Sequence, residues 1–514
     1  MDSDGAQGDQ KEGTQGAQAA RLAQRTRAAE RLALAGFLLF AVFAPHSIAG
    51  AEIGLALVGL GWLWRAVVSR STGLKGRAPQ DLPICLFLGW TVLSALLSEE
   101  PRISLPKLQS VCVVLLFYLT RAVLVRRTAL LVAALMIASG VAGVCWSVID
   151  IARGRGVRIE EMAAESPFRQ VPVAPGDAVW RIGGRRVSSI EEIDDAIRTA
   201  PLNKPLSVSF IRQGEHGEWP ALPLTDEARA RPSPSGLKGS GPTHRFRASG
   251  WTRHYETFSE TLQILAQLAL GLALANMRKQ FTRRRTALLL LLASGTLALG
   301  IVLTAMRTVL VALAIGACVI AWRAARKDLR LIIYAVIVLL LIVGSLAVWR
   351  TRSTGALSFN DDSTRLRVEV ARVGLKRLMI HPFFGHGMDA VKKHWTEWGL
   401  PGTNMIHMHS TPLQLAFDRG LPALFLWLWI MASFWLTAVR GERSARDDED
   451  TNCHGLLLGA TGAIAGIFAS SLVNYNFGDG EVALVFWWLM GVVVLAVDSG
   501  SLNVKEDNDA LPPG

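Results

Sequence analysis

The sequence predicts an all-α polytopic membrane protein of about 12 transmembrane helices, with a small α+β domain inserted between predicted helices 5 and 6. Three observations predict this fold class. The 514-residue chain is 51% hydrophobic and only 19% charged, whereas soluble chains carry about 25% charged residues. Its mean hydropathy is +0.32. Apolar runs recur that approach the roughly 20 residues needed to cross a bilayer, so a soluble enzyme is a poor interpretation.

The predicted elements follow one another along the chain. A disordered cytoplasmic segment, 1–28, is expected because it is rich in Gly, Gln, Ala and Asp. The first apolar run is retained, since no small-residue cleavage site follows it. The predicted spans are 32–48, 51–68, 82–98, 108–125, 128–149, 257–277, 286–304, 308–323, 331–349, 420–439, 454–473 and 481–497. The predicted domains are helices 1–5 (29–149), the α+β domain (150–230), its linker (231–256), helices 6–9 (257–349), a long loop (350–419), helices 10–12 (420–497) and a cytoplasmic tail (498–514).

Positive charge marks one side of the membrane. The connections that follow even-numbered spans hold most of the basic clusters, for example Arg126 with Arg127. By the positive-inside rule both termini are cytoplasmic, and the segments 150–256 and 350–419 lie outside. The net charge of +12 is then a topology signal, and we expect no nucleic-acid partner. The five cysteines lie in or beside apolar runs without CxxC spacing, so no disulfide framework is indicated.

The segment 156–225 has the pattern of a compact domain. Strands are predicted at 156–162, 178–182, 206–214 and 218–224, and an amphipathic helix at 189–200. This order, with Pro175-Gly176-Asp177 before a strand and a Gly183-Gly184 turn, resembles a bacterial PDZ domain. The resemblance implies that a peptide or partner protein adds to a sheet edge, with a carboxylate held near 153–156. The alternative is a spacer that rests on the membrane domain and binds no peptide.

The second outer segment concentrates histidines. Five of the ten in the chain fall in it: His381, His386, His394, His407 and His409. A metal site would use them as neutral ligands, but neither HExxH spacing nor a recognisable set of acidic ligands accompanies them. The alternative is a histidine acting as general base beside arginines that hold an anionic substrate, because its pKa of about 6.5 suits proton abstraction and arginine binds phosphate bidentately. We therefore expect no metal and no cofactor.

A longer pattern runs through the same segment. It comprises an Arg before a Gly, the stretch His-Pro-Phe-Phe-Gly-His-Gly, and His409-x-x-x-Leu-Gln running into Arg-Gly-Leu-Pro. With the helix plan and Arg307 at a helix start, it resembles the O-antigen ligase and polymerase superfamily. The resemblance implies that His409 removes a proton from the acceptor sugar hydroxyl, with Ser410 in place of the usual Asn. It also implies that Arg307 and Arg367 neutralise a lipid-linked pyrophosphate.

Several neighbouring residues are further candidates. Arg365 could share the role of Arg367, because the register of the pattern leaves both open. The possible substrate-binding residues are His407, Gln414, Arg253 and His254. For these the alternative is a structural or interfacial position. Arg307 likewise could snorkel to a lipid phosphate, although an arginine inside a membrane segment is normally functional.

The resemblance implies a multi-pass enzyme of the bacterial inner membrane that acts in lipopolysaccharide biosynthesis. Its donor would be a glycan on undecaprenyl diphosphate, and its acceptor a lipid A-core or a related glycan, at the periplasmic face among membrane lipids. A polymerase that joins repeat units, or a protein O-oligosaccharyltransferase, would use the same chemistry. A transporter or a scaffold bearing the PDZ-like domain is the non-enzymatic alternative. A transporter is disfavoured because ionisable residues gather at helix ends and not at mid-membrane.

Overall fold

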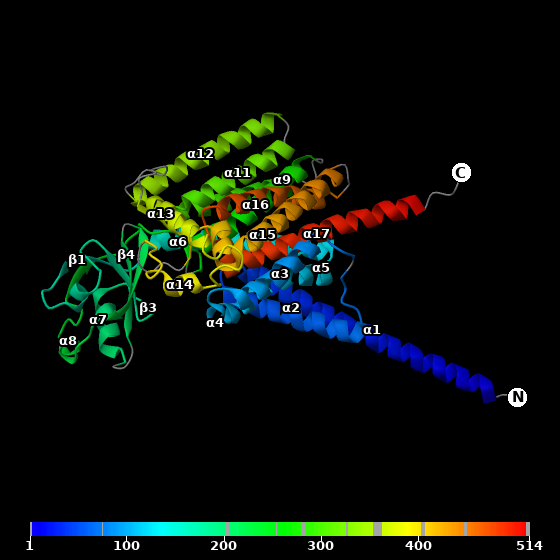
Figure 1. Ribbon diagram of the computed structural model, residues 1–514, viewed down its shortest axis with the longest axis horizontal. Helices are drawn as coiled ribbons and strands as arrows, with labels where there is room; N and C mark the ends of the chain where they lie inside the picture. Colours follow the sequence, from blue (N-terminus) through cyan, green and yellow to red (C-terminus); the bar gives the residue numbers. More distant parts are fainter. Residues whose placement is uncertain are drawn as a thin grey trace.

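The computed structural model describes residues 3–74, 76–201, 205–212, 214–252, 254–278, 284–324, 327–352, 362–401, 407–446 and 450–509. A bundle of helices makes up most of it, and a small sheet domain stands at one end (Figure 1). Both termini lie at the end of the bundle remote from that sheet (Figure 1). The bundle consists of α1 (Ser3–Phe43), α2 (Ile48–Ser69), α3 (Asp81–Leu97), α4 (Pro101–Ser104), η1 (Leu105–Val114), α5 (Leu115–Val123), α6 (Arg126–Arg153), α9 (Tyr255–Arg278), α10 (Arg284–Thr304), α11 (Arg307–Ala324), α12 (Lys327–Arg352), α13 (Asp362–Leu378), α14 (Ala390–His394), α15 (Thr411–Ser444), α16 (Thr451–Ser471), η4 (Asn476–Gly478) and α17 (Gly480–Asp509).

The helices fit a polytopic membrane protein. Within the described ranges, nine helical segments are long and apolar enough to cross a membrane. They are α2, the segment from α4 through α5, α6, α9, α10, α11, α15, α16 and α17. The other predicted spans, 32–48, 82–98 and 331–349, fall largely on α1, α3 and α12, of which α3 and α12 are apolar over shorter lengths. The polytopic architecture is confirmed, whereas the count of about twelve stays a prediction.

The inserted domain is an antiparallel sheet with a helix packed on it. Its strands run in the order β5-β4-β2-β1-β6, and β3 pairs with β2. Residues of α7 such as Ile193 and Ile197 are buried against Val179 and Val208 of the sheet. The strands and the helix predicted within 156–225 are therefore confirmed. The elements are β1 (Val157–Met162), η2 (Pro167–Gln170), β2 (Ala178–Ile182), β3 (Arg185–Arg186), α7 (Ile190–Thr199), β4 (Leu206–Arg212), β5 (Glu215–Leu222), α8 (Asp226–Ala230) and β6 (Leu237–Ser240).

Two segments predicted to lack structure carry it. The predicted linker, 231–256, contributes β6, because the apolar Leu237 is buried in the sheet core and pairs with Met162 of β1. The predicted disordered segment, 1–28, is helical from Ser3 onward. The overall composition of this segment predicted disorder. Its alanines, glutamines and arginines are nevertheless good helix formers.

The insert is fixed to the bundle where it enters and leaves. Arg155 and Thr243 exchange two backbone hydrogen bonds of 2.8 and 3.0 Å. The buried Arg155 guanidinium pairs with Asp150 at the end of α6 and lies 4.4 Å from the ring centre of Phe246. The N–H of Gly154 donates to the Asp150 carbonyl. These N–H groups, expected to hold a peptide carboxylate near 153–156, are already engaged, and the likeness to a PDZ domain gains no support.

Helices α9 and α16 form the buried centre of the bundle. They approach so closely that a Cβ atom on Gly271 would lie 2.2 Å from the backbone nitrogen of Gly459. Small residues allow such backbone contact between membrane helices. The close packing brings polar side chains together at one end, where the Ser470 hydroxyl donates to Glu260 at 2.7 Å. This end of the bundle carries the candidate site.

Helix α15 begins before residue 420, where the predicted span 420–439 starts. It is also broken at Gly420. Gly420 has φ 81° and ψ 169°, which interrupts the helix. A Cβ atom there would lie 1.8 Å from the carbonyl oxygen of Phe383, so only glycine fits. The N–H of Leu421 donates to the Pro382 carbonyl at 2.8 Å, outside the helix. The loop that follows α13 is thereby built into the break.

Candidate active site

The turn before α15 presents two histidines side by side. The ring centres of His407 and His409 lie 4.4 Å apart, and the His409 N–H donates to Nδ1 of His407 at 3.4 Å. His409 has φ 51°, a left-handed conformation that is uncommon outside glycine and costs of order 1 kcal/mol. Ser410 is the N-cap of α15, and its hydroxyl accepts from the N–H of Leu413 at 3.4 Å. Asn and Ser are both favoured N-cap residues. Ser410 can therefore cap α15 in place of the Asn that is usual in the superfamily the sequence resembles.

A polar network joins this turn to three other helices. Thr411 donates its hydroxyl to the Asn474 carbonyl at 3.1 Å, just after α16. The Asn474 amide donates to Glu260 of α9 at 2.9 Å and to the hydroxyl of Thr308 in α11 at 3.1 Å. Thr308 directly follows Arg307, which is half-buried at the start of α11. The network therefore sets the start of α11 and the histidine turn at the same end of the bundle.

The two loop arginines differ in their surroundings. Both lie on α13, where side chains two residues apart point in nearly opposite directions. Arg367 is half-buried, and its charge acts on both His407 and His409, whereas Arg365 is exposed. The structure thus brings Arg367, and not Arg365, to the histidines.

Both imidazoles are held in the neutral form. Burial, then the neighbouring His407, then Arg367 lower the pKa of His409 to about 3. Burial and Arg367 also lower the pKa of His407, against a smaller opposing effect of Asp479. A histidine of ordinary pKa, about 6.5, would be partly protonated at neutral pH. His409 is therefore neutral at neutral pH.

A cavity of about 610 Å³ opens beside the turn. Tyr475, which lines it, has its ring centre 5.7 Å from that of His407. Gln414 also lines it, but its oxygen accepts from the Met408 N–H at 2.6 Å and its nitrogen donates to Asp418 at 2.8 Å. The predicted substrate-binding residue Gln414 is therefore engaged in bracing the turn. Neither histidine is among the residues that line this cavity.

Two predicted substrate-binding residues remain, Arg253 and His254. His254 is exposed just before α9. Arg253 lies outside the described residues.

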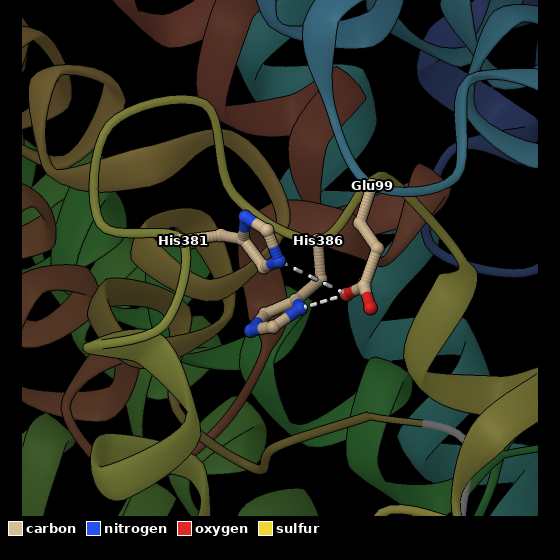
Figure 2. Close-up of side chains that lie close together, drawn as sticks. All are labelled: Glu99, His381 and His386. Carbon is tan, nitrogen blue, oxygen red and sulfur yellow. Dashed lines mark hydrogen bonds and ion pairs between the residues drawn. The ribbon is translucent and has the colours of Figure 1, made fainter.

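One group of metal-ligand side chains occurs within the described ranges, formed by Glu99, His381 and His386 (Figure 2). The buried His386 points Nδ1 at the Glu99 carboxylate, and its Nε2 lies 3.0 Å from the carbonyl oxygen of Arg377. Nε2 of His381 is 3.9 Å and the Arg377 guanidinium 3.8 Å from Glu99. Burial opposes ionisation of Glu99, but His386, His381 and Arg377 bring its pKa below the ordinary value. The three side chains could hold a divalent cation in competition with Arg377, and the absence of a metal stays a prediction.

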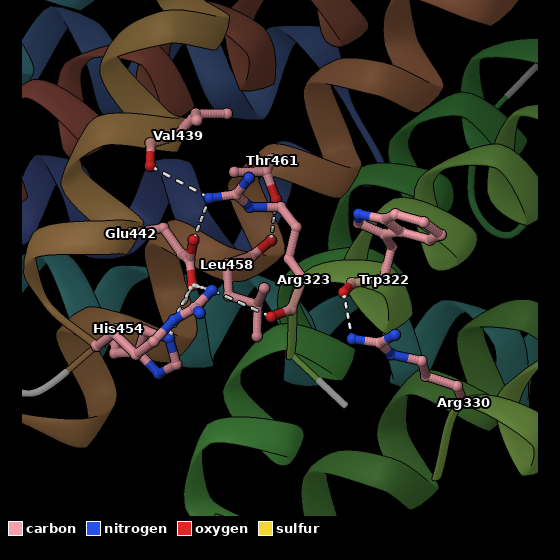
Figure 3. Close-up of polar contacts among 9 residues, drawn as sticks. Trp322, Arg323, Arg330, Val439, Glu442, His454, Leu458 and Thr461 are labelled. Atoms are coloured by element: carbon pink, nitrogen blue, oxygen red, sulfur yellow. Dashed lines mark hydrogen bonds and ion pairs between the residues drawn. The ribbon is translucent and has the colours of Figure 1, made fainter. Parts of the chain in front are cut away.

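A second charged cluster lies where α11 and α15 end and α16 begins. Figure 3 shows Arg323, Glu442 and His454 of this cluster. The buried Glu442 accepts from Arg323, from Arg446 at 3.0 Å and from His454 at 3.1 Å. These residues tie the ends of α11, α15 and α16 together. Arg323 is sixteen residues from Arg307, or about 24 Å along α11, so this cluster is structural and separate from the site.

A comparison with known families matches part of the chain. Residues 288–428 match the family model described as O-antigen ligase. The matched segment runs from α10 into α15 and contains Arg307, Arg367, His407 and His409. No curated protein matches the chain. The match supports the O-antigen ligase superfamily and, with the membrane-spanning helices, indicates a multi-pass membrane protein with a glycan ligase or polymerase type of function.

Sequence reasoning missed three residues of this region. Asn474 and Tyr475 lie between α16 and α17, where a short polar run interrupts apolar sequence. This polar interruption is the sequence signal from which Asn474 and Tyr475 could have been found. Arg419 stands in the Arg-Gly-Leu-Pro pattern, yet nothing in the sequence indicates that its side chain lines the cavity.

Proposed function

We propose that the protein is an O-antigen ligase-like glycosyltransferase. It would move a glycan from undecaprenyl diphosphate to a lipid A-core or related acceptor at the periplasmic face of the bacterial inner membrane. The observation that carries this proposal is Arg367 set beside the paired neutral imidazoles of His407 and His409 at the start of α15. A cation for a phosphate next to a neutral base is what transfer from a diphosphate carrier requires.

In the proposed reaction His409 takes the proton from the acceptor hydroxyl. The oxygen then attacks the anomeric carbon, and the bond between that carbon and the diphosphate oxygen breaks. The electron pair leaves with the diphosphate, whose charge Arg367 and Arg307 stabilise. Such a single displacement inverts the anomeric centre. Because arginines supply the positive charge, the reaction needs no metal.

The pKa of His409 predicts an unusual pH dependence. At about 3 it keeps the imidazole neutral at mildly acidic pH. We expect kcat/KM, which reports the free enzyme, to stay level between about pH 7 and pH 5, where an ordinary histidine would lose about 25-fold. A bound diphosphate offsets the charge of Arg367, so the acid limb of kcat should lie at higher pH. An acid limb of kcat/KM near pH 6.5 would contradict this assignment.

Lipopolysaccharide banding on a gel tests the proposal. A deletion strain is compared with the same strain carrying the wild-type protein at matched expression. Loss of all long-chain bands with accumulation of lipid-linked polymer supports the ligase. Core carrying a single repeat unit indicates the polymerase instead. An unchanged ladder would reject both and direct the search to protein glycosylation or to a non-enzymatic role.

A further inference from the structure

Two histidine ring nitrogens converge on one carboxylate oxygen in the group formed by Glu99, His381 and His386. Nδ1 of His386 and Nε2 of His381 both approach Oε2 of Glu99, the second at 3.9 Å (Figure 2). The three ligand atoms lie within 4.8 Å of one another. The Arg377 guanidinium approaches the other oxygen, Oε1, at 3.8 Å. Its charge weakens the attraction for a cation without occupying the position between the two histidines.

The hydrogen bonding of His386 decides which of its ring nitrogens carries a lone pair. Nε2 lies 3.0 Å from the Arg377 carbonyl oxygen, which can only accept, so Nε2 carries a hydrogen. In the neutral ring Nδ1 is then an acceptor that faces a carboxylate oxygen, also an acceptor. Such a pair repels unless a metal ion or a proton lies between the two atoms. A proton needs only these two partners, whereas the approach of His381 to the same oxygen supplies a third ligand.

The surroundings of His386 fix its imidazole as those of metal-binding histidines are fixed. The ring is fully buried, stacked at 4.4 Å on Phe417 and 5.0 Å from the Trp398 ring. Histidines that bind metal ions almost always donate their other N–H to a carboxylate, a backbone carbonyl or water, and the Arg377 carbonyl takes this place here. The ring is therefore oriented before any ion binds.

The other two side chains can adjust their positions. The side chains of Glu99 and His381 are 33% and 43% exposed. The backbone of Glu99 is held, because its N–H donates to the Gly385 carbonyl at 3.4 Å and the next N–H donates to the His386 carbonyl at 3.1 Å. A tetrahedral zinc ion with bonds of about 2.1 Å places its ligand atoms about 3.4 Å apart. Small rotations of two partly exposed side chains reach this spacing, with water as the fourth ligand.

We propose that Glu99, His381 and His386 bind a zinc ion that ties two distant parts of the chain together. Two imidazole nitrogens and a carboxylate suit Zn²⁺, whereas Mg²⁺ and Ca²⁺ prefer oxygen ligands alone. Glu99 follows α3 and the histidines follow α13. The ion thus holds the loop that is built into the break of α15. This inference replaces the sequence-based expectation of no metal, and it is independent of the proposed reaction, which needs none.

The test is zinc binding by the full-length protein in detergent, purified with a tag that contains no histidine and stripped with a chelator. Affinity is measured by competition with a chromophoric chelator. We expect one Zn²⁺ per chain, and a loss of affinity of about 100-fold or more in His381→Asn and in Glu99→Gln, because even an outer partner of a ligand is worth about 10- to 100-fold. Zinc should raise the melting temperature of the wild type and not of these variants. Mg²⁺ should do neither.

The matched control is His394→Asn. Nδ1 of His394 faces Glu397 at 2.6 Å and its Nε2 faces Glu100 at 2.8 Å, so its two nitrogens point to different carboxylates and share no third ligand. We expect this variant to bind zinc like the wild type. Thermal melting without zinc checks that every variant is folded, and the partly exposed His381 is the ligand whose replacement disturbs packing least.

The outcomes separate the zinc site from its alternatives. No zinc binding by the wild type would place a proton between His386 and Glu99, and it overturns the proposal. Equal zinc affinity of the wild type and folded His381→Asn would show an adventitious ion only, and it overturns the proposal as well. If zinc binds as expected and the wild-type protein supports no glycan transfer, only the proposed function fails.

Discussion

Replacing His409 with asparagine is expected to abolish glycan transfer without disturbing the fold. Removing a general base costs about 10²- to 10⁴-fold in rate. Asparagine tolerates the left-handed backbone that His409 adopts with φ 51°, so the turn before α15 should persist. Its amide cannot accept the hydroxyl proton, because an amide is not a base at neutral pH. The loss should therefore be chemical.

The measurement is lipopolysaccharide banding in the deletion strain complemented with His409→Asn, with membrane abundance checked by immunoblot. His244→Asn is the matched control, since His244 lies between β6 and α9 and bonds to the Ile151 carbonyl at 3.0 Å. We expect it to restore the full ladder. A full ladder from His409→Asn at equal abundance would show that His409 is not the base.

The second large effect is a difference in kcat/KM between variants of two arginines that are two residues apart. Arg367→Gln should lower kcat/KM by about 100-fold or more, the usual cost of removing one group that stabilises transition-state charge. Arg365→Gln should change it by less than about 3-fold, because substitutions of exposed residues away from a site have small effects. The contrast follows from the placement of Arg367 at the histidines and of Arg365 on the exposed side of α13.

This comparison needs purified protein and a lipid-linked donor, with transferred glycan quantified over time. Arg367→Gln should also shift the acid limb of activity to higher pH, because its charge contributes to the lowered pKa of His409. A role confined to folding would give no such shift. Equal losses in the two variants would refute the assignment of Arg367.

The sequence predicted those features of the structure that depend on residues close together in the chain. Apolar runs located the helices, and alternation located the strands of the insert, because each depends on neighbouring residues. The histidine turn was found because its residues are close in the chain. Asn474 was missed because its partners, Glu260 and Thr308, are far away in sequence and meet it only after α9, α11 and α16 have packed.

The same reason explains the other differences. The break in α15 depends on Gly420 lying against the carbonyl of Phe383, a contact made by another part of the chain. Strand β6 was classed as linker because its sequence is short and rich in small residues, and only pairing with β1 gives it structure. The buried state of Arg419 likewise arises from the helices that surround it.

The paired backbone of Arg155 and Thr243 also has an evolutionary consequence. Because the insert leaves α6 and returns toward α9 at adjoining points, its ends already meet. Domains whose ends are close together can be gained or lost while the host structure keeps its arrangement. A shorter ancestor would need only a tight turn in place of residues 156–242. The membrane helices and the histidine turn can therefore descend as one unit and the sheet domain as another, each under its own selection.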